Sequence, residues 1–322
     1  MVRVWLLWVC RARWRAVSGG TARAAGLSPT TKCGAGQTFH RPTLAGQLPI
    51  LRDALKFFDE RAGPPAKGLL DRFIRRFSSL SYAVATLALF VVAASALGIA
   101  LVPSLLIVRL LAPPLLTDGH WWTWPVLGVL GGAALFLWGF ALLIVVPVFN
   151  FVLPTRMQPT RGGYFSSASL PLYLHNGLFY LVRFTFLPFV TLTPPGVWFL
   201  RAMRMRMGLR PRISTEFLSD VCLISLGDDV TIGGSAHIFC HYGGAGNLVL
   251  APVIIGSRVT VGEKATVMGD VQIGEGATIL AHSVLLPGTR VGAGERWGGV
   301  PARPISHEEW DAYKVQVLGA ER

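Results

Sequence analysis

Charged residues are scarce in this sequence, and acidic residues are missing from long parts of it. Only 15% of the 322 residues are Asp, Glu, Lys or Arg, and 52% are hydrophobic, whereas charged residues make up roughly 25% of a typical soluble chain. No acidic residue precedes Asp53. This composition excludes a disordered chain and argues against a wholly soluble protein. The length is enough for two units of ordinary domain size.

Cysteine is scarce as well. The chain has four, Cys10, Cys33, Cys222 and Cys240, and none of them forms a C-x-x-C pair. A small disulfide-stapled domain needs closely spaced cysteines, and a cysteine-ligated zinc site usually needs such a pair. The cysteine pattern therefore predicts neither a disulfide framework nor a cysteine zinc site.

The formal net charge of +13 belongs to one part of the chain only. Residues 1–212 hold 23 basic and 5 acidic residues, a net charge of +18; residues 213–305 hold 5 and 8, and residues 306–322 hold 2 and 4. The basic part is also the apolar part. That combination is typical of charges that flank membrane spans and not of a nucleic-acid-binding face, so we expect no nucleic-acid partner.

Two long apolar runs lie in the predicted membrane region, residues 79–212. Leu80–Val108 and Trp124–Leu153 contain no charged residue, and each exceeds the roughly 20 apolar residues that cross a bilayer. Trp121, Trp122 and Trp124 stand at the edge of the second run, where interfacial aromatic residues are common. The sequence therefore predicts two transmembrane helices, at about 80–108 and 124–153.

The residues before the first span fall into two parts. Residues 1–46 are basic and free of acidic residues, and we interpret them as a leader that is either disordered or not part of the real protein. Residues 47–78 show apolar residues at helical spacing, with Lys67, Arg72 and Arg75 on the polar side. This pattern predicts amphipathic helices that lie on an anionic membrane surface, with membrane lipid as a partner.

Residues 170–200 are apolar but broken by polar residues and prolines, namely His175, Asn176, Arg183, Pro188, Pro194 and Pro195. Basic clusters lie before the first span, after the second span and after residue 200. All three are cytoplasmic only if the chain crosses the membrane twice. We therefore expect a multi-pass membrane protein in which 170–200 is interfacial or re-entrant, Arg183 finds a polar partner, and the C-terminal domain is cytoplasmic.

Aliphatic residues recur every six positions from Leu226 onward. The series is Leu226, Ile232, Ile238, Ile255, Val261, Val267, Ile273, Ile279, Leu285 and Val291, and glycine follows six of the ten. This period predicts a parallel β-helix over residues 213–305, followed by a C-terminal tail, 306–322. Each hexapeptide would form one strand and one corner, and three would form a triangular coil.

The physical expectations for such a coil are specific. The aliphatic residues point into the prism and stack on one another. Glycine is expected at the corners because the corner must be small and because glycine adopts turn conformations that other residues resist. Slightly over three coils at roughly 4.8 Å between strands give a prism about 16 Å tall. The open ends need capping, and the three flat faces favour a closed trimer.

The repeat and the segment Trp297–Ile305 resemble the left-handed β-helix acyltransferases of the hexapeptide-repeat superfamily. Those enzymes commonly end their coils in G-x-P-A-[RK]-x-I, which Gly299–Ile305 matches. Apolar spans before a short β-helix are most similar to the membrane-attached acyltransferase-like C-terminal domains of peptide synthetases, of the poly-lysine synthetase type. The resemblance covers about 213–305 for the β-helix and, more loosely, 70–212 for the membrane region.

The resemblance implies a catalytic histidine on a loop that leaves the coil. The six-residue register breaks between Ile238 and Ile255, and this interruption carries His241. Histidine is suited to take a proton near neutral pH. We therefore expect His241 to be the general base of an acyltransferase that moves an acyl group from acyl-CoA to a hydroxyl or amine of a small-molecule acceptor.

The same resemblance implies how the donor binds. Acetyl-CoA or another acyl-CoA would be the donor substrate and would lie in a groove between neighbouring prisms of a homotrimer. Arg303 would meet a coenzyme phosphate, and Gly299 and Ala302 would allow the pantetheine arm to approach closely. No metal is expected.

Three other interpretations of these residues are open. His237, His241 and His282 could bind zinc as three histidines do in γ-type carbonic anhydrases, although their order and spacing differ and a solvent-facing turn suits His282 better. Cys240 could be a nucleophile, although adjacent strand residues point to opposite faces, so a buried hydrophobic role is favoured. Finally, a β-helix could be a non-catalytic trimerisation scaffold at the membrane, which would need neither the His241 loop nor the Gly299–Ile305 ending.

Overall fold

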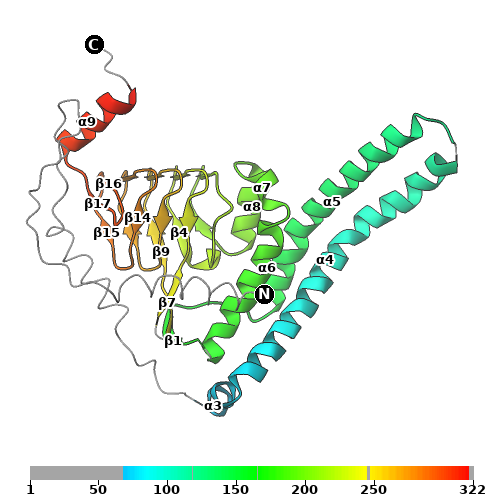
Figure 1. Cartoon of the computed structure of the whole chain (residues 1–322), viewed down its shortest axis with the longest axis horizontal. Coiled ribbons are helices and arrows are strands. Elements are labelled where there is room, and N and C mark those ends of the chain that lie inside the picture. The colour runs from blue at the N-terminus through cyan, green and yellow to red at the C-terminus, as the bar shows by residue number, and fades with distance from the viewer. Residues whose placement is uncertain (1–67, 118, 165, 245–246, 319–322) are drawn as a thin grey trace, which may run out of the picture. The chain divides into compact units, whose positions relative to one another are not determined.

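A computed structural model of the chain describes residues 68–117, 119–164, 166–244 and 247–318 (Figure 1). All of these belong to one of the chain's two compact units, residues 47–322. The predicted leader, 1–46, lies outside the described residues, as does the first part of the predicted amphipathic segment, 47–67. Of that segment the structure shows the short helix α3 (Leu69–Arg76).

Two long apolar helices follow. They are α4 (Ser78–Thr117) and α5 (Thr123–Val152), and both are long and apolar enough to cross a membrane. α4 is longer than the predicted span 80–108 because it continues past Arg109 through Pro113 and Pro114. The two helices pack through small residues, and Ser104 Oγ donates a hydrogen bond to the Ala134 carbonyl at 2.7 Å.

The segment after α5 consists of short elements. They are β1 (Thr160–Gly163), η1 (Ser167–Ser169), α6 (Leu170–Arg183), α7 (Leu187–Val190) and α8 (Pro194–Ala202). At 1.5 Å per residue, the 14 residues of α6 reach only about 21 Å, which is less than the roughly 30 Å of a hydrocarbon core. Among the described residues only α4 and α5 qualify as spans, in agreement with two crossings.

The predicted parallel β-helix follows α8. Its strands are β2 (Arg206–Met207), β3 (Arg212–Ile213), β4 (Ile224–Leu226), β5 (Thr231–Ile232), β6 (His237–Ile238), β9 (Val253–Ile255), β10 (Thr260–Val261), β11 (Thr266–Val267), β12 (Gln272–Ile273), β13 (Thr278–Ile279), β14 (Val284–Leu285), β15 (Arg290–Val291), β16 (Arg296–Gly298) and β17 (Arg303–Pro304). They form three sheets, with the orders β15-β12-β9-β4-β2, β17-β16-β13-β10-β5-β3 and β14-β11-β6.

The strand register confirms the six-residue period. Val261 pairs with Ile279, and Val267 pairs with Leu285, so each regular coil consists of three hexapeptides. All ten aliphatic residues of the predicted series are buried. Across the interruption, Ile238 still pairs with Val267 in the next coil. The extra residues of that coil therefore leave the prism, and the stack of strands continues without a shift.

The β-helix begins at β2, one strand before the boundary expected at residue 213 and one coil before the six-residue series starts at Leu226. Met207 pairs with Leu226, and Ile213 pairs with Ile232. Leu218 bridges to Ile238, which completes this first coil. The six-residue series does not reveal the extra coil because the step from Ile213 to Leu218 is one position too short, and the step from Leu218 to Leu226 is two positions too long.

The repeat glycines fill small corners, as expected, but they do not supply the expected turn conformation. The glycines that follow the inward residues, such as Gly227 and Gly256, do not have positive φ. They are needed for space, because a Cβ on Gly227 would lie 2.5 Å from the Ser257 backbone nitrogen in the next coil. The left-handed conformation falls two residues further on, where Asp229 and Arg258 have φ of 55° and 57°.

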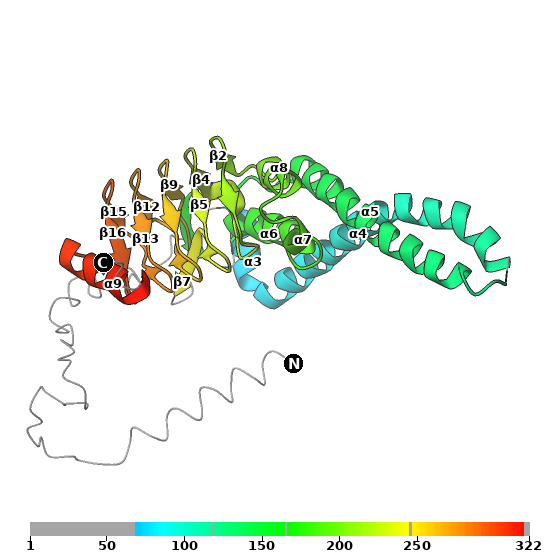
Figure 2. The same cartoon turned by 90° about the horizontal axis from the view of Figure 1, so that it is seen from above.

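The two ends of the prism are covered. Helices α6, α7 and α8 lie next to the end that begins with β2, as Figure 2 shows, and Phe199, Leu200 and Met203 are buried in one core with the inward residues of the coils. Helix α9 (His307–Leu318) follows the last coil, within the predicted tail. Arg296 lies 4.8 Å from the ring centroid of Trp310 on this helix.

Candidate active site

His241 begins a β-hairpin that leaves the prism. β7 (His241–Gly244) and β8 (Asn247–Leu250) pair antiparallel, and β8 pairs on its other side with β1. The base of the hairpin is closed where the Ala251 N–H donates to the Cys240 carbonyl at 2.8 Å. His241 thus lies at the root of the predicted loop, with its side chain 32% exposed.

Asp220 is the partner of His241, although no sequence motif marked it. Its Oδ2 lies 2.6 Å from His241 Nδ1 and also accepts the Cys240 backbone N–H at 3.0 Å. Asp220 is fully buried and has φ of 55°, a conformation that aspartate tolerates better than most residues. One signal for it exists in the sequence, because the stretch from Ile213 to Leu226 is one position longer than two hexapeptides, and Asp220 lies within it.

The environment raises the pKa of His241. Burial lowers this pKa, but the hydrogen bond and the negative charge of Asp220 raise it by more, so the pKa lies above its ordinary value. Because Asp220 holds Nδ1, Nε2 is the ring nitrogen left to face a substrate, and the carboxylate stabilises the imidazolium once it forms. The pair can therefore take a proton from a hydroxyl or amine and hold the resulting positive charge.

The structure contradicts Cys240 as a nucleophile. Its side chain is fully buried, and burial, together with the charge of Asp220, raises the pKa of the thiol well above its usual value. A nucleophilic cysteine needs an accessible thiolate. The prediction of a buried hydrophobic role is confirmed, and Cys240 serves the site through its backbone N–H.

The zinc alternative finds no cluster of ligands within the described part of the single chain. Among the residues that the structure describes, no group of three or more His, Cys, Asp or Glu side chains is placed to hold a metal ion. His237 stacks on Phe217 with ring centroids 4.6 Å apart, while His241 faces Asp220. His282 has φ of 59° at an exposed turn, as expected. The three histidines do not converge.

The predicted coenzyme segment lies on the same side of the prism as the strand that leads to His241. The Val284 N–H donates to the Gly299 carbonyl, and the Ala302 N–H donates to the Val284 carbonyl. This segment therefore continues the stack of β6, β11 and β14. Three strand spacings, about 14 Å, separate it from the strand that leads to His241.

The three predicted coenzyme-binding residues differ in their surroundings. Gly299 has φ of 96°, and a Cβ there would contact only the Pro301 carbonyl, so the space beside it is open. Ala302 is buried. Arg303 forms a two-point ion pair with Glu309 of α9, with Nη2–Oε1 at 2.8 Å and Nη1–Oε2 at 3.0 Å. Glu309 is therefore an anionic competitor for any phosphate that Arg303 would bind.

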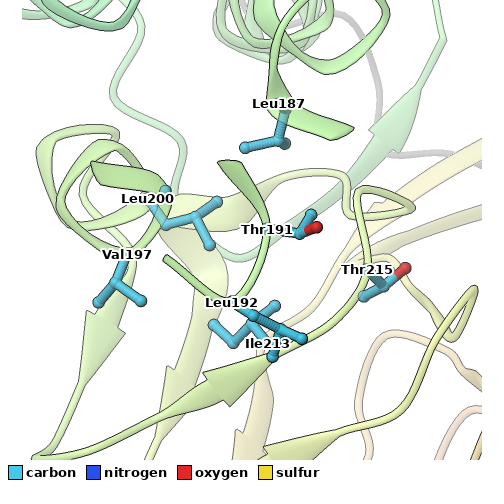
Figure 3. A pocket seen from close by; sticks show the side chains of 8 residues that line it. Leu187, Thr191, Leu192, Val197, Leu200, Ile213 and Thr215 are labelled. Atoms are coloured by element: carbon cyan, nitrogen blue, oxygen red, sulfur yellow. The ribbon is translucent and has the colours of Figure 1, made fainter. Parts of the chain in front are cut away.

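A small apolar pocket lies elsewhere, between the capping helices and the first coil (Figure 3). Its lining residues are Leu187, Thr191, Leu192, Gly196, Val197, Leu200, Ile213 and Thr215. The empty volume is at most about 210 Å³, below the roughly 300 Å³ at which small-molecule sites begin. The Thr215 hydroxyl is already bonded to the Ala236 carbonyl. We interpret the pocket as loose packing and not as a substrate site.

Comparison with family models gives the decisive match for the coil. Residues 252–287 match the model described as bacterial transferase hexapeptide, six repeats. The chain carries bacterial transferase hexapeptide repeats. The match spans β9 to β14, and this repeat implies a left-handed β-helix, as the sequence predicted. No curated protein matches the chain.

Solved structures with similar coils include three acetyltransferases. A hexapeptide-repeat acetyltransferase from Vibrio cholerae O1 biovar eltor, complexed with acetyl coenzyme A, is 24% identical with a TM-score of 0.29; the match covers 31% of this chain and 58% of that one. A maltose O-acetyltransferase from Clostridium difficile 630 is 17% identical (47% and 93% covered, TM-score 0.34). A galactoside acetyltransferase in complex with coenzyme A is 17% identical (44% and 84% covered, TM-score 0.34). All three TM-scores are below 0.5, so the hexapeptide-repeat assignment rests on the family model and on the coils themselves.

Proposed function

We propose that the protein is a membrane-anchored acyltransferase that uses an acyl-CoA, most simply acetyl-CoA, to acylate a hydroxyl or amine of a small-molecule acceptor. The Asp220–His241 pair carries this proposal. Burying a carboxylate costs free energy unless it is paired and hydrogen-bonded, and here the buried carboxylate holds one nitrogen of a partly exposed imidazole. A trimerisation scaffold would need no such pair.

The proposed reaction is direct acyl transfer. His241 Nε2 takes the proton of the acceptor O–H or N–H while the acceptor atom bonds to the thioester carbon. The carbonyl oxygen becomes an oxyanion, which backbone N–H groups of the coil can stabilise. The carbon–sulfur bond then breaks, and the leaving coenzyme thiolate takes the proton back from the His241 imidazolium. Asp220 stabilises that imidazolium throughout.

The donor is proposed to bind along the side of the prism that links His241 to Gly299–Arg303. The open space beside Gly299 suits close approach of an extended arm, and Arg303 would leave Glu309 to bind a phosphate of the coenzyme. By resemblance to the hexapeptide-repeat acyltransferases, this side of the prism would form a groove with a neighbouring prism. We therefore include a homotrimer in the proposal.

The membrane part of the proposal is supported by exposed apolar side chains. Leu110, Val129 and Phe136 are among the many large apolar side chains that α4 and α5 leave exposed, and a patch of this kind is rare on a soluble monomer. Trp121 and Trp124 are exposed at the tip between the helices. With the basic clusters on the cytoplasmic side, the hexapeptide-repeat domain is cytoplasmic, and α6 to α8 lie at the interface.

The test uses the full chain in lipid nanodiscs with radiolabelled acetyl-CoA and an extract of cellular metabolites and membrane lipids as acceptors. His241→Ala should lower label transfer by about 10²- to 10⁴-fold. His120→Ala is the matched control, because His120 is exposed between α4 and α5 and has no part in the Asp220 pair. Undiminished transfer by His241→Ala would overturn the base, and a folded wild-type protein without transfer from any acyl-CoA would favour the scaffold.

A further inference from the structure

Asn176 of helix α6 holds Asp220 at two points. Asn176 Nδ2 donates to Asp220 Oδ1 at 2.7 Å, and the Asp220 backbone N–H donates to Asn176 Oδ1 at 2.9 Å. Both residues are buried. The two carboxylate oxygens thus have separate partners: Oδ1 binds the Asn176 amide, while Oδ2 binds His241 and the Cys240 N–H. Apart from the half-turn that exchanges its two equivalent oxygens, a rotation of the carboxylate would disturb both sets of bonds.

The same face of α6 also contacts the two residues before Asp220. Tyr180 and Arg183 follow Asn176 at four and seven positions, which places all three on one helix face. Tyr180 Oη lies 2.8 Å from Ser219 Oγ, and Arg183 Nη1 donates to the Leu218 carbonyl at 3.3 Å. Arg183 therefore has the polar partner that its position in an apolar segment requires. One face of α6 therefore contacts three consecutive residues of the first coil, 218–220.

Helix α6 is itself fixed by both long apolar helices. Gly177 lies so close to Leu89 of α4 that a Cβ would approach the Leu89 side chain to 2.5 Å. His175 Nδ1 lies 2.9 Å from Asn150 Oδ1 of α5, and His175 and Asn150 are fully buried. Asn176 therefore lies on a helix that packs against both predicted spans and against the first coil.

We propose that Asn176 is a positioning residue for acyl transfer, which acts through Asp220 on His241 and makes α6 of the membrane region part of the active site. The role in turnover rests on the proposed function; the coupling of the three side chains does not. Without the amide, Oδ1 would be left buried and unpaired, which is costly. The carboxylate would turn to find another partner, and His241 would lose the bond that sets its ring orientation and tautomer.

The other groups near Asp220 do not compete with His241 for its charge. They are His175 on α6, Cys222 on η2 (Val221–Leu223) and Cys240, with Arg204 beyond them. Burial lowers the pKa of His175 to about 4 and raises the pKa of Cys222 to about 11. His175, Cys222 and Cys240 are therefore neutral near pH 7, and Arg204 donates to the Asn150 carbonyl and to Thr155 Oγ1 instead of to Asp220. A change in the orientation of Asp220 should therefore alter mainly the pKa of His241.

The test combines nuclear magnetic resonance with turnover, on the full chain in nanodiscs. The pKa of His241 is measured from its ¹⁵N-labelled imidazole, assigned with His241→Ala. Asn176→Ala should lower this pKa, because burial still disfavours the charged ring while Asp220 is no longer held against it. The kcat should fall about 10- to 100-fold, the effect typical of a partner that orients a functional histidine, with KM for acetyl-CoA unchanged. Asn176→Ser keeps one hydrogen bond and should show a smaller loss.

Tyr180→Phe is the matched control, since it removes a contact of the same helix face without touching Asp220. It should leave the pKa of His241 unchanged. In an Asp220→Asn background, Asn176→Ala should lower kcat by less than about threefold, because the carboxylate that Asn176 positions is already absent.

Three results would overturn the proposal: an unchanged His241 pKa in Asn176→Ala, equal effects of Asn176→Ala and Tyr180→Phe, or full additivity with Asp220→Asn. If Asn176→Ala does not fold, Asn176→Ser decides by the same criteria. If His241→Ala retains turnover, the proposed function fails, while the titration still tests the coupling of Asn176 to His241.

Discussion

Asp220 Oδ2 lies 2.6 Å from His241 Nδ1, and each of the two residues lies in a separate break of the same six-residue repeat. The first break adds a single position between Ile213 and Leu226, and the second inserts the β7–β8 hairpin after Ile238. Uninterrupted coils have no room for a buried charge, because every inward position stacks on its equivalents in an apolar prism. The candidate site therefore lies where the six-residue repeat is interrupted.

Asp220→Asn should impair the base without unfolding the coil, because the amide keeps the shape of the side chain. We expect kcat to fall by about 10² to 10⁴, the range for loss of a histidine-orienting carboxylate. The pKa of His241 should fall, since burial lowers it and Asp220 raises it. The neutral base then persists to lower pH, so the acidic limb of the kcat profile should move downward. A limb that moves upward would contradict the assigned pair.

Cys240→Ala should leave acyl transfer nearly intact. The thiol is buried and the site uses only the backbone N–H of this residue. We expect kcat within about threefold of wild type and a loss of stability of about 1 kcal/mol from the small cavity. Turnover and thermal unfolding measured on the same preparation check this. A large loss of kcat with a folded protein would restore Cys240 as a catalytic group.

Arg303→Ala should weaken donor binding and leave the chemical step alone. Loss of a charged hydrogen bond to phosphate predicts a rise in KM for acetyl-CoA of about 10-fold or more. Acetyl-pantetheine has no phosphate, so its KM should not change. Glu309→Gln frees Arg303 from its ion pair and should not raise KM for acetyl-CoA. Equal effects of Arg303→Ala on both donors would place Arg303 outside the phosphate site.

Gly227→Ala and Gly276→Ala separate the two roles of glycine in the coil. A Cβ on Gly227 would lie 2.5 Å from Ser257 atoms in the next coil, whereas Gly276 has open space and φ of 68°. The first change should cost about 1–3 kcal/mol or more through overpacking, and the second about 1–2 kcal/mol through backbone strain. Thermal unfolding should therefore show the lower midpoint for Gly227→Ala.

The proposed topology predicts where a protease can reach the hexapeptide-repeat domain. A C-terminal epitope placed after α9 should be cleaved in inside-out vesicles and protected in right-side-out vesicles. A tag inserted at 118–120, between the two apolar helices, should behave in the opposite way. Protection of the C-terminal epitope in inside-out vesicles would reverse the orientation inferred from the basic clusters.

Much of the fold could be predicted because its patterns are local. Each coil contacts only its neighbours, so one short period describes the whole prism, and the ten aliphatic residues that show it are all buried. The first coil escaped this pattern because Leu218 is displaced from the six-residue register. The small size of the glycine corners was predicted correctly, whereas their turn conformation was not, because the close contacts are with the next coil and form only on folding.

The sequence alone determined the coil, the two apolar helices and the histidine that interrupts the repeat, because period, length and composition are properties of neighbouring residues. Only the tertiary structure decided that Asp220 orients His241, that Asn176 holds Asp220, and that Arg303 is paired with Glu309. Three of these residues, Asn176, Asp220 and His241, are far apart in the chain. They meet because α6 caps the prism beside its first two coils, where Asp220 follows Leu218 and His241 follows Ile238, the residue paired with Leu218. No local pattern encodes that contact.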